Sequence, residues 1–162
     1  MSNFWNYSIE EVEELRERVI TEAKKLLNTP FAHRGRTRFG VDCLGFVYLA
    51  YTKAGIPNIV CGDGKPYEPN WYWFCDKERY LDSLLKYTEF VEEPIRADVV
   101  VFRCFKDIVT HGGIFLGGRE FIHAPSGNST HHRKVKIDTL DHRYWGSKKR
   151  FAGFLRFKGF IV

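Results

Sequence analysis

Hydrophobic residues near the start of the chain recur at intervals of three and four positions, the spacing of one face of an α-helix. They run from Ile9 to Leu27 and end before Pro30. Ser8 and Glu11 stand three residues apart at the beginning of this run, in a capping-box pattern that favours a helix start. The pattern predicts an amphipathic helix.

A second helical pattern begins at Cys43 and closes with Gly55 and Pro57. The segment before it, 31–41, is rich in Gly and Arg and is typical of a loop. We therefore expect a second helix that carries Cys43 in its first turn.

The next stretch, 58–75, combines glycines and prolines with four consecutive aromatic residues at 71–74. This composition predicts a long ordered loop. A short helix is predicted over about 76–87. Three of its leucines are expected to face inward: Leu81, Leu84 and Leu85.

The pattern changes after Pro94, where short β-branched and aromatic segments are separated by Gly, Asn and Ser. Strands are predicted at 99–102, 114–116, 120–122, 135–137 and 151–157. Helices in the front half and antiparallel strands in the back half indicate an α+β domain, with N-terminal helices packed on a C-terminal antiparallel β-sheet. We predict one domain over 1–162, helical over about 8–90 and sheet-forming over about 95–160.

Composition agrees with a single domain, because 162 residues with 44% hydrophobic and 16% aromatic content can bury one sizeable core. The net charge of +5 favours anionic surroundings without selecting one. No nucleic-acid-binding signature accompanies the basic residues, so we expect no nucleic-acid partner.

The first six residues lack the pattern of a secretory signal, and no apolar run approaches the length of a membrane span. We therefore expect a chain made in the cytoplasm, without membrane insertion. Its four cysteines show no paired short spacing, and cytoplasmic synthesis argues against a disulfide framework. A Cys61–Cys75 bridge in an oxidising setting stays open.

Cys43 is the candidate nucleophile. Peptide N–H groups at a helix start carry partial positive charge, which favours the thiolate and supplies donors for an oxyanion. Asp42 can cap this helix, and Gly45 lets another backbone or a ligand come close. A buried structural cysteine is the alternative, and these two neighbours favour the nucleophile.

His111 and His123 are the candidate partners of this thiol. His111 follows a polar turn, so its ring can stand at an edge of the sheet that faces the helix of Cys43. A two-residue turn between the two predicted strands would place the imidazoles on opposite faces, whereas an odd-length loop or a bulge places them on one face. If His123 orients His111, as the third member of a catalytic triad does, the hairpin must contain such an irregularity.

A metal site is the rival use of these side chains, because thiol and imidazole groups are metal ligands. The ligands would be Cys43, His111, His123, His131 and His132. No ligand pair has the short spacing of zinc sites, so we predict neither a metal nor a cofactor. His131 and His132 are expected in a surface loop.

Three segments in this order resemble the NlpC family of papain-like cysteine peptidases: 42–45, 111–117 and 121–124. The similarity extends over roughly residues 20–158. Within that family the chain is most similar to tail-associated cell-wall peptidases of tailed phages. That likeness rests on 29–36 leading into 40–43, on 97–102 and on 154–157.

The resemblance implies a papain-like NlpC fold and hydrolysis of an amide bond in the stem peptide of peptidoglycan, typically between D-glutamate and a diamino acid. It implies Cys43 as nucleophile, His111 as base and His123 as orienting residue, with no cofactor. The implied partners are peptidoglycan stem peptides and phage tail proteins, and the implied location is a virion tail that acts on the cell wall.

Two positions depart from the family pattern. Many members follow the nucleophile with a serine that helps to bind the free amino end of the stem peptide, and here that residue is Leu44. Twelve residues before the nucleophile, Phe31 replaces a tyrosine whose hydroxyl reaches the site. His33 or Arg34 is expected to serve in its place.

Asp42, Arg34 and Arg36 complete the predicted substrate-binding set. Guanidinium groups match carboxylates in bidentate geometry, so the arginines are candidates for stem-peptide carboxylates, and solvated loop charges are the alternative. The aromatic residues at 71–73 form either a wall of the cleft or part of the core. The usual Gly-Asp before the first core strand reads Ala97-Asp98, a change that we expect to be structural only.

Two other functions stay open. A papain-like amidase or acyltransferase acting on another substrate would share the fold and the residues. A non-catalytic structural tail component could also keep the fold, although intact Cys43, His111 and His123 favour an enzyme.

Overall fold

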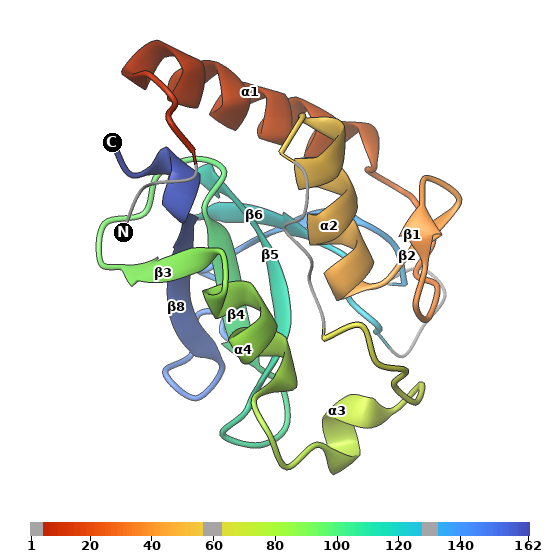
Figure 1. Cartoon of the computed structure of the whole chain (residues 1–162). Helices are drawn as coiled ribbons and strands as arrows, with labels where there is room; N and C mark the ends of the chain where they lie inside the picture. Colours follow the sequence, from red (N-terminus) through yellow and green to blue (C-terminus); the bar gives the residue numbers. More distant parts are fainter. Residues whose placement is uncertain (1–4, 57–62, 128–132) are drawn as a thin grey trace.

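The computed structural model describes residues 5–56, 63–127 and 133–162 (Figure 1). Its helices are α1 (Ile9–Lys25), α2 (Cys43–Lys53), α3 (Trp71–Phe74), α4 (Arg79–Leu85) and the 3-10 helix η1 (Lys158–Phe160). Its strands are β1 (Arg36–Thr37), β2 (Gly40–Val41), β3 (Thr88–Val91), β4 (Val99–Arg103), β5 (Val109–Gly117), β6 (Glu120–His123), β7 (Lys136–Thr139) and β8 (Phe151–Phe157).

Strands β3 to β8 form one antiparallel sheet in the order β3-β8-β4-β5-β6-β7, and β1 and β2 form a separate small hairpin. Helices α1 and α2 pack on each other and on β5 (Figure 1). The predicted α+β fold, with N-terminal helices on a C-terminal antiparallel sheet, is confirmed.

Helix α1 begins where the capping box predicts. The backbone N–H of Glu11 donates to Ser8 Oγ at 3.2 Å, and Ser8 N–H donates to the Glu11 carboxylate at 2.7 Å. The side chains of Val12, Val19 and Ala23 lie at most 5% exposed. Their three- and four-residue spacing explains why this face of α1 packs on the domain core.

Asp98 ties α1 to the sheet. Its fully buried carboxylate accepts hydrogen bonds from Arg16 at 3.2 Å and from Arg156 at 2.8 Å. The residue before it, Ala97, has φ +74°, in the left-handed region that favours glycine. The glycine that the family usually has at this position would carry that conformation without strain, so the local backbone explains the preference.

Several elements differ from the predictions. No strand was predicted at the end of the helical half, but β3 forms there and pairs with β8 at the edge of the sheet. The 31–41 loop contains the β1–β2 hairpin, and the 58–75 loop contains α3. Helix α4 is shorter than predicted, and of its leucines Leu84 is fully buried while Leu81 and Leu85 are half-buried.

Short elements of this kind depend on tertiary pairing more than on local spacing, which explains why the pattern missed them. Within the three described ranges, no helix has both the length and the apolar character needed to cross a membrane.

Candidate active site

The candidate nucleophile lies at the beginning of α2. Asp42 is the N-cap, and its carboxylate accepts a hydrogen bond from the backbone N–H of Gly45 at 2.8 Å. Cys43 is therefore the first residue of the helix, as predicted. Its side chain is 8% exposed, and its thiol contacts the backbone oxygen of Thr110, with Sγ and O 3.8 Å apart. The fold thus brings the thiol beside the residue that precedes His111.

Asp42 does more than cap the helix. Besides Gly45, its carboxylate accepts hydrogen bonds from Arg36 Nη1 at 2.7 Å, from the backbone N–H of Arg34 at 2.9 Å and from the hydroxyl of Tyr67. With four protein donors on a side chain that is 4% exposed, Asp42 is engaged within the protein. These contacts fix the start of the helix that carries Cys43. Asp42 also lines the cleft described below, so its contact with substrate stays a prediction.

Gly45 lets another backbone segment come close to α2, as predicted. That segment is Gly35, whose oxygen lies 1.8 Å from the place where a Cβ on Gly45 would stand.

The two histidines lie on one face of the sheet. β5 and β6 pair with Gly113 opposite His123, and a register irregularity falls between Phe115 and Gly117. This is the irregularity that the parity argument requires, so that prediction is confirmed. The expected position at a sheet edge is wrong, because β5 lies between β4 and β6.

A hydrogen-bonded series runs back from His111. Its Nε2 lies 2.7 Å from Nδ1 of His123, and Nε2 of His123 lies 2.7 Å from Oδ2 of Asp138. Both histidines are buried, His123 completely. Asp138 was not predicted, because its β7 position 15 residues beyond His123 carries no local motif.

This series selects the tautomers. A carboxylate only accepts hydrogen bonds, so Nε2 of His123 donates to Asp138 and Nδ1 of His123 accepts. Nε2 of His111 must then be the donor to His123. The free lone pair of a neutral His111 is therefore on Nδ1, the nitrogen that can take the proton of a thiol.

Burial sets the charge states of the three groups. It lowers the pKa of His111 well below its usual range, and the charge of His123 acts in the same direction while Asp138 opposes it. Burial also lowers the pKa of His123 against the hydrogen bond and charge of Asp138. For Asp138, burial acts to raise the pKa, but the hydrogen bond and charge of His123 and the charge of Lys136 outweigh it and leave the pKa lowered. In the resting site His111 and His123 are therefore neutral, and the Asp138 side chain is an ionised carboxylate.

Asp138→Asn is expected to lower kcat/KM about tenfold or more, because a carboxylate hydrogen-bonded behind the catalytic imidazoles holds their tautomers and orientation. The acidic side chain is also what favours protonated histidines, so its loss lowers the pKa of His111 further. Neutral His111 is the base that takes the thiol proton, so activity is lost at low pH as His111 becomes protonated, and the acidic limb of the kcat/KM profile moves to lower pH in the variant.

The measurement is kcat/KM against pH on a soluble peptidoglycan fragment. Asp141→Asn is the matched control, because Asp141 pairs with Arg119 at the surface. An acidic limb that stays in place in Asp138→Asn would contradict the role of Asp138.

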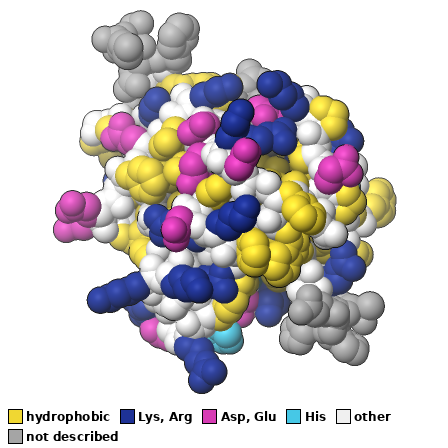
Figure 2. Space-filling view, turned by 90° about the horizontal axis from the view of Figure 1, so that it is seen from below, with side chains coloured by type: hydrophobic (Ala, Val, Ile, Leu, Met, Phe, Trp, Pro, Cys, Tyr) yellow, Lys and Arg dark blue, Asp and Glu magenta, His cyan; other side chains and the backbone are white. Residues whose placement is uncertain are grey.

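Cys43 and His111 open on one cleft with a volume of about 440 Å³. Phe31, His33 and the aromatic residues 71–73 also line it, which settles the aromatic run as cleft wall. Trp145, which was not singled out, stacks on the His111 ring with centroids 5.1 Å apart. Figure 2 shows the molecule from below, from the end that carries α3 in Figure 1. On this face hydrophobic side chains gather beside Lys and Arg side chains.

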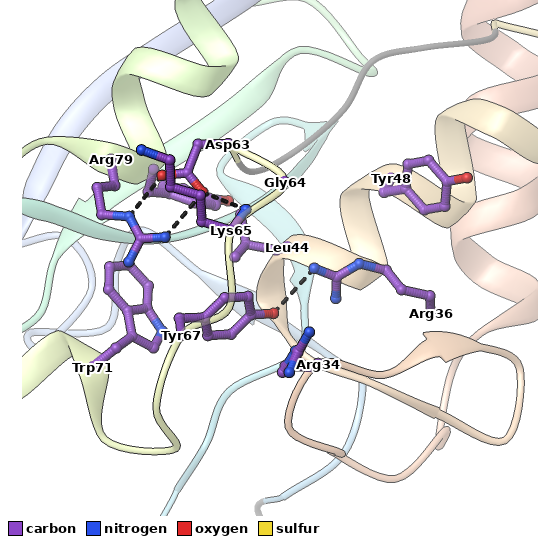
Figure 3. Close-up of a pocket in the computed structure, with 11 residues that line it drawn as sticks. Arg34, Arg36, Leu44, Tyr48, Asp63, Gly64, Lys65, Tyr67, Trp71 and Arg79 are labelled. Atoms are coloured by element: carbon purple, nitrogen blue, oxygen red, sulfur yellow. Dashed lines mark hydrogen bonds and ion pairs between the residues drawn. The ribbon is translucent and has the colours of Figure 1, made fainter.

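Three of the residues predicted to bind substrate lie outside the cleft. Arg34, Arg36 and Leu44 line a second cavity, next to the cleft (Figure 3). His33 differs from these three, because it lines the cleft, and its Nε2 lies 2.9 Å from the backbone oxygen of Tyr67.

Among the residues that the structure describes, no cluster of three or more His, Cys, Asp or Glu could hold a metal ion. His131, His132 and Cys61 lie outside the described residues.

A thiol at a helix start, beside an imidazole from an antiparallel sheet with further groups ordered behind it, is the arrangement of papain-like thiol hydrolases. The chain belongs to the NlpC/P60 family, whose model matches residues 28–156. The resemblance to the NlpC family is thus confirmed.

Two curated relatives are similar over most of this chain. The chain is 29% identical over 140 residues to "Probable peptidoglycan endopeptidase LytE" of Bacillus subtilis (strain 168), a match that covers 86% of this chain and 34% of the relative. It is 28% identical over 146 residues to "Gamma-DL-glutamyl hydrolase" of the same organism, covering 89% of this chain and 30% of the relative. The chain thus spans about a third of the length of each.

Solved structures support the fold. A lipoprotein-like NLP/P60 family protein from Staphylococcus aureus subsp. aureus Mu50 superposes with TM-score 0.64 at 24% identity, over 90% of this chain and 42% of that chain. The NlpC/p60 domain of the peptidoglycan hydrolase SagA superposes with TM-score 0.56 at 19% identity, over 85% of this chain and 97% of that chain.

Proposed function

We propose that this protein is a cysteine endopeptidase that hydrolyses an amide bond in the stem peptide of bacterial peptidoglycan, of the D-glutamyl–diamino acid type. The observation that carries the proposal is the series from His111 through His123 to Asp138, beside a thiol at a helix start. A purely structural cysteine has no need of such a series. The names of LytE and SagA, both peptidoglycan enzymes, support the substrate class.

The chemistry follows from the tautomers. The proton of the Cys43 thiol passes to Nδ1 of His111 as sulfur attacks the scissile carbonyl carbon, and the oxyanion accepts a hydrogen bond from the backbone N–H of Cys43. The imidazolium returns the proton to the leaving amine as the C–N bond breaks, which leaves a thioester. Water, deprotonated by His111, then releases the acid and restores the thiol.

Digestion of purified peptidoglycan, followed by mass spectrometry of the muropeptides, tests the proposal. Wild type is expected to produce fragments cut at the D-glutamyl–diamino acid bond, and the Cys43→Ala protein purified in parallel is not. Cleavage elsewhere would make the chain an amidase with another target. Intact muropeptides in both samples would favour a non-catalytic role.

A γ-glutamyl bond outside the cell wall is the second candidate target. The relative named "Gamma-DL-glutamyl hydrolase" supports it, because the two chains are 28% identical over 146 residues. Poly-γ-glutamate incubated beside peptidoglycan distinguishes the two, since the preferred polymer is the one degraded at lower protein concentration.

We also propose that the protein works as a component of a phage or prophage tail. The support is the likeness of 29–36, 97–102 and 154–157 to tail-associated peptidases. Peptide mass spectrometry of purified particles tests this location, and particles that lack the chain would refute it.

A further inference from the structure

A second cavity, which we call the helix-side pocket, lies next to the cleft and has a volume of about 440 Å³ (Figure 3). Leu44 lines it, one residue after the candidate nucleophile, and Trp71 lines both the pocket and the cleft. This volume is within the range of small-ligand sites. The two cavities therefore offer one continuous surface to a peptide bound across Cys43.

The pocket combines apolar walls with an excess of positive charge. The walls include Leu44, Tyr48 and Trp71. Its charged lining residues are Arg34, Arg36, Lys65, Arg79 and one acid, Asp63.

Two of these cations are already neutralised. Arg79 makes a bidentate pair with Asp63 at 2.8 and 2.9 Å, which helps to lower the pKa of that carboxyl to about 2. Arg36 pairs with Asp42 at 2.7 Å and also donates to the Tyr67 hydroxyl at 3.0 Å.

Among the described residues the other two cations, Arg34 and Lys65, make no ion pair, although the charge of Lys65 also helps to lower the pKa of Asp63. Both side chains are exposed. The Arg34 guanidinium lies 5.9 Å from the centre of the Tyr67 ring, so it stays at the pocket. The pocket consequently carries a surplus of about two positive charges, which attracts an anion and repels an ammonium group.

The position of the pocket indicates which part of the substrate it receives. Among the described residues, none from the six-stranded sheet lines the pocket, whereas Thr110 and His111 of that sheet line the cleft. The leaving amine must lie near His111 to be protonated, so the acyl part of the substrate extends away from the sheet. That direction leads to the helix-side pocket.

We propose that the helix-side pocket binds the free carboxylate of an acidic residue on the acyl side of the scissile bond, through Arg34 and Lys65. This inference rests on the proposed function for the direction of the peptide. It also explains Leu44, because an apolar side chain contacts the aliphatic part of such a residue and offers no hydrogen bond to a free amino end. The pocket thus selects an anionic group where the resemblance implies a free amine.

Binding to the Cys43→Ala protein tests the pocket without requiring turnover. The probes are two synthetic tripeptides, L-alanyl-γ-D-glutamyl-L-lysine and its D-isoglutaminyl counterpart, which differ only in one carboxylate against a carboxamide. Calorimetry at low salt is expected to show about tenfold tighter binding of the carboxylate, the scale of charge-assisted contacts at a partly exposed site. The preference should weaken as ionic strength rises.

The double substitution Arg34→Gln and Lys65→Gln, on the Cys43→Ala background, is expected to bring the ratio of the two affinities close to one. Arg38→Gln is the control, because it removes one positive charge from the neighbouring hairpin and Arg38 does not line the pocket. The proposal would be overturned if the two probes bind equally or if neither binds measurably at millimolar concentration. It would also be overturned if the ratio of affinities is unchanged in the double variant, or if Arg38→Gln lowers the ratio as much as the double variant does.

Because these assays use an inactive protein, their result is separate from that of peptidoglycan digestion. A carboxylate preference without hydrolysis by wild type would refute the proposed function and keep the pocket. Hydrolysis without the preference would do the reverse.

Discussion

Cys43→Ala is expected to lower the hydrolysis of peptidoglycan fragments about 10⁴-fold or more. Loss of a nucleophile removes the covalent route altogether, and comparable losses are known for the nucleophiles of other hydrolases. Among the cysteines that the structure describes, no second thiol can replace it. Cys104 lines the same cleft, but burial raises its pKa to about 11, so it stays protonated at neutral pH.

The measurement is the initial rate of release of new amino groups from a defined muropeptide. Cys75→Ala is the matched control, since it removes a thiol outside the cleft, and it should retain the wild-type rate. Alanine is the best helix former and Asp42 still caps α2, so Cys43→Ala should melt within a few degrees of wild type. A Cys43→Ala protein that hydrolyses the muropeptide at a rate near that of wild type would remove Cys43 from the mechanism.

Gly45→Ala is expected to destabilise the protein by about 3 kcal/mol, in the upper range for overpacking. The added Cβ would stand 1.8 Å from the Gly35 oxygen and 2.7 Å from Arg36 Nη1. Backbone cannot give way as a flexible side chain can, so the loop at 34–36 must move. Its movement would break the hydrogen bonds of Arg36 and of the Arg34 N–H to Asp42.

Thermal unfolding checks this expectation, with a fall in Tm of about 10 °C for a chain of this size. Gly118→Ala is the control: Gly118 has φ +60° and open space around it, so alanine there costs only backbone strain of about 1 kcal/mol. If Gly45→Ala unfolds at the same temperature as Gly118→Ala, the close approach of the Gly35 backbone does not constrain the fold.

Much of the fold could be predicted because its signals are local. Ser8 and Asp42 each cap a helix through atoms within three residues, so the sequence marks both helix starts. The strands that carry His111 and His123 contain short apolar or alternating runs of residues, and such runs can be recognised from neighbouring positions in the sequence. Side-chain parity in a hairpin is also a local property, and it requires the irregularity beside Leu116 if the two histidines share a face.

Some of the parts that escaped prediction depend on distant pairing. β3 is a strand because β8 offers it an edge, 60 or more residues further along the chain. The β1–β2 hairpin within 31–41 is paired locally, but over only two residues on each strand, too few to show an alternating pattern. The approach of Gly35 to Gly45 in α2 is the part of this segment that depends on the tertiary structure.

By itself the sequence determined where α1 and α2 begin, that the domain is α+β, and that Cys43, His111 and His123 are the residues to bring together. Only the tertiary structure decided that Asp138 stands behind His123, that Tyr67 and Arg36 occupy Asp42, and that Arg34 and Lys65 flank a separate pocket. The physical reason is range. Capping and periodicity act over three or four neighbours, whereas hydrogen bonds and charges act between whichever side chains the folded chain brings within a few ångströms.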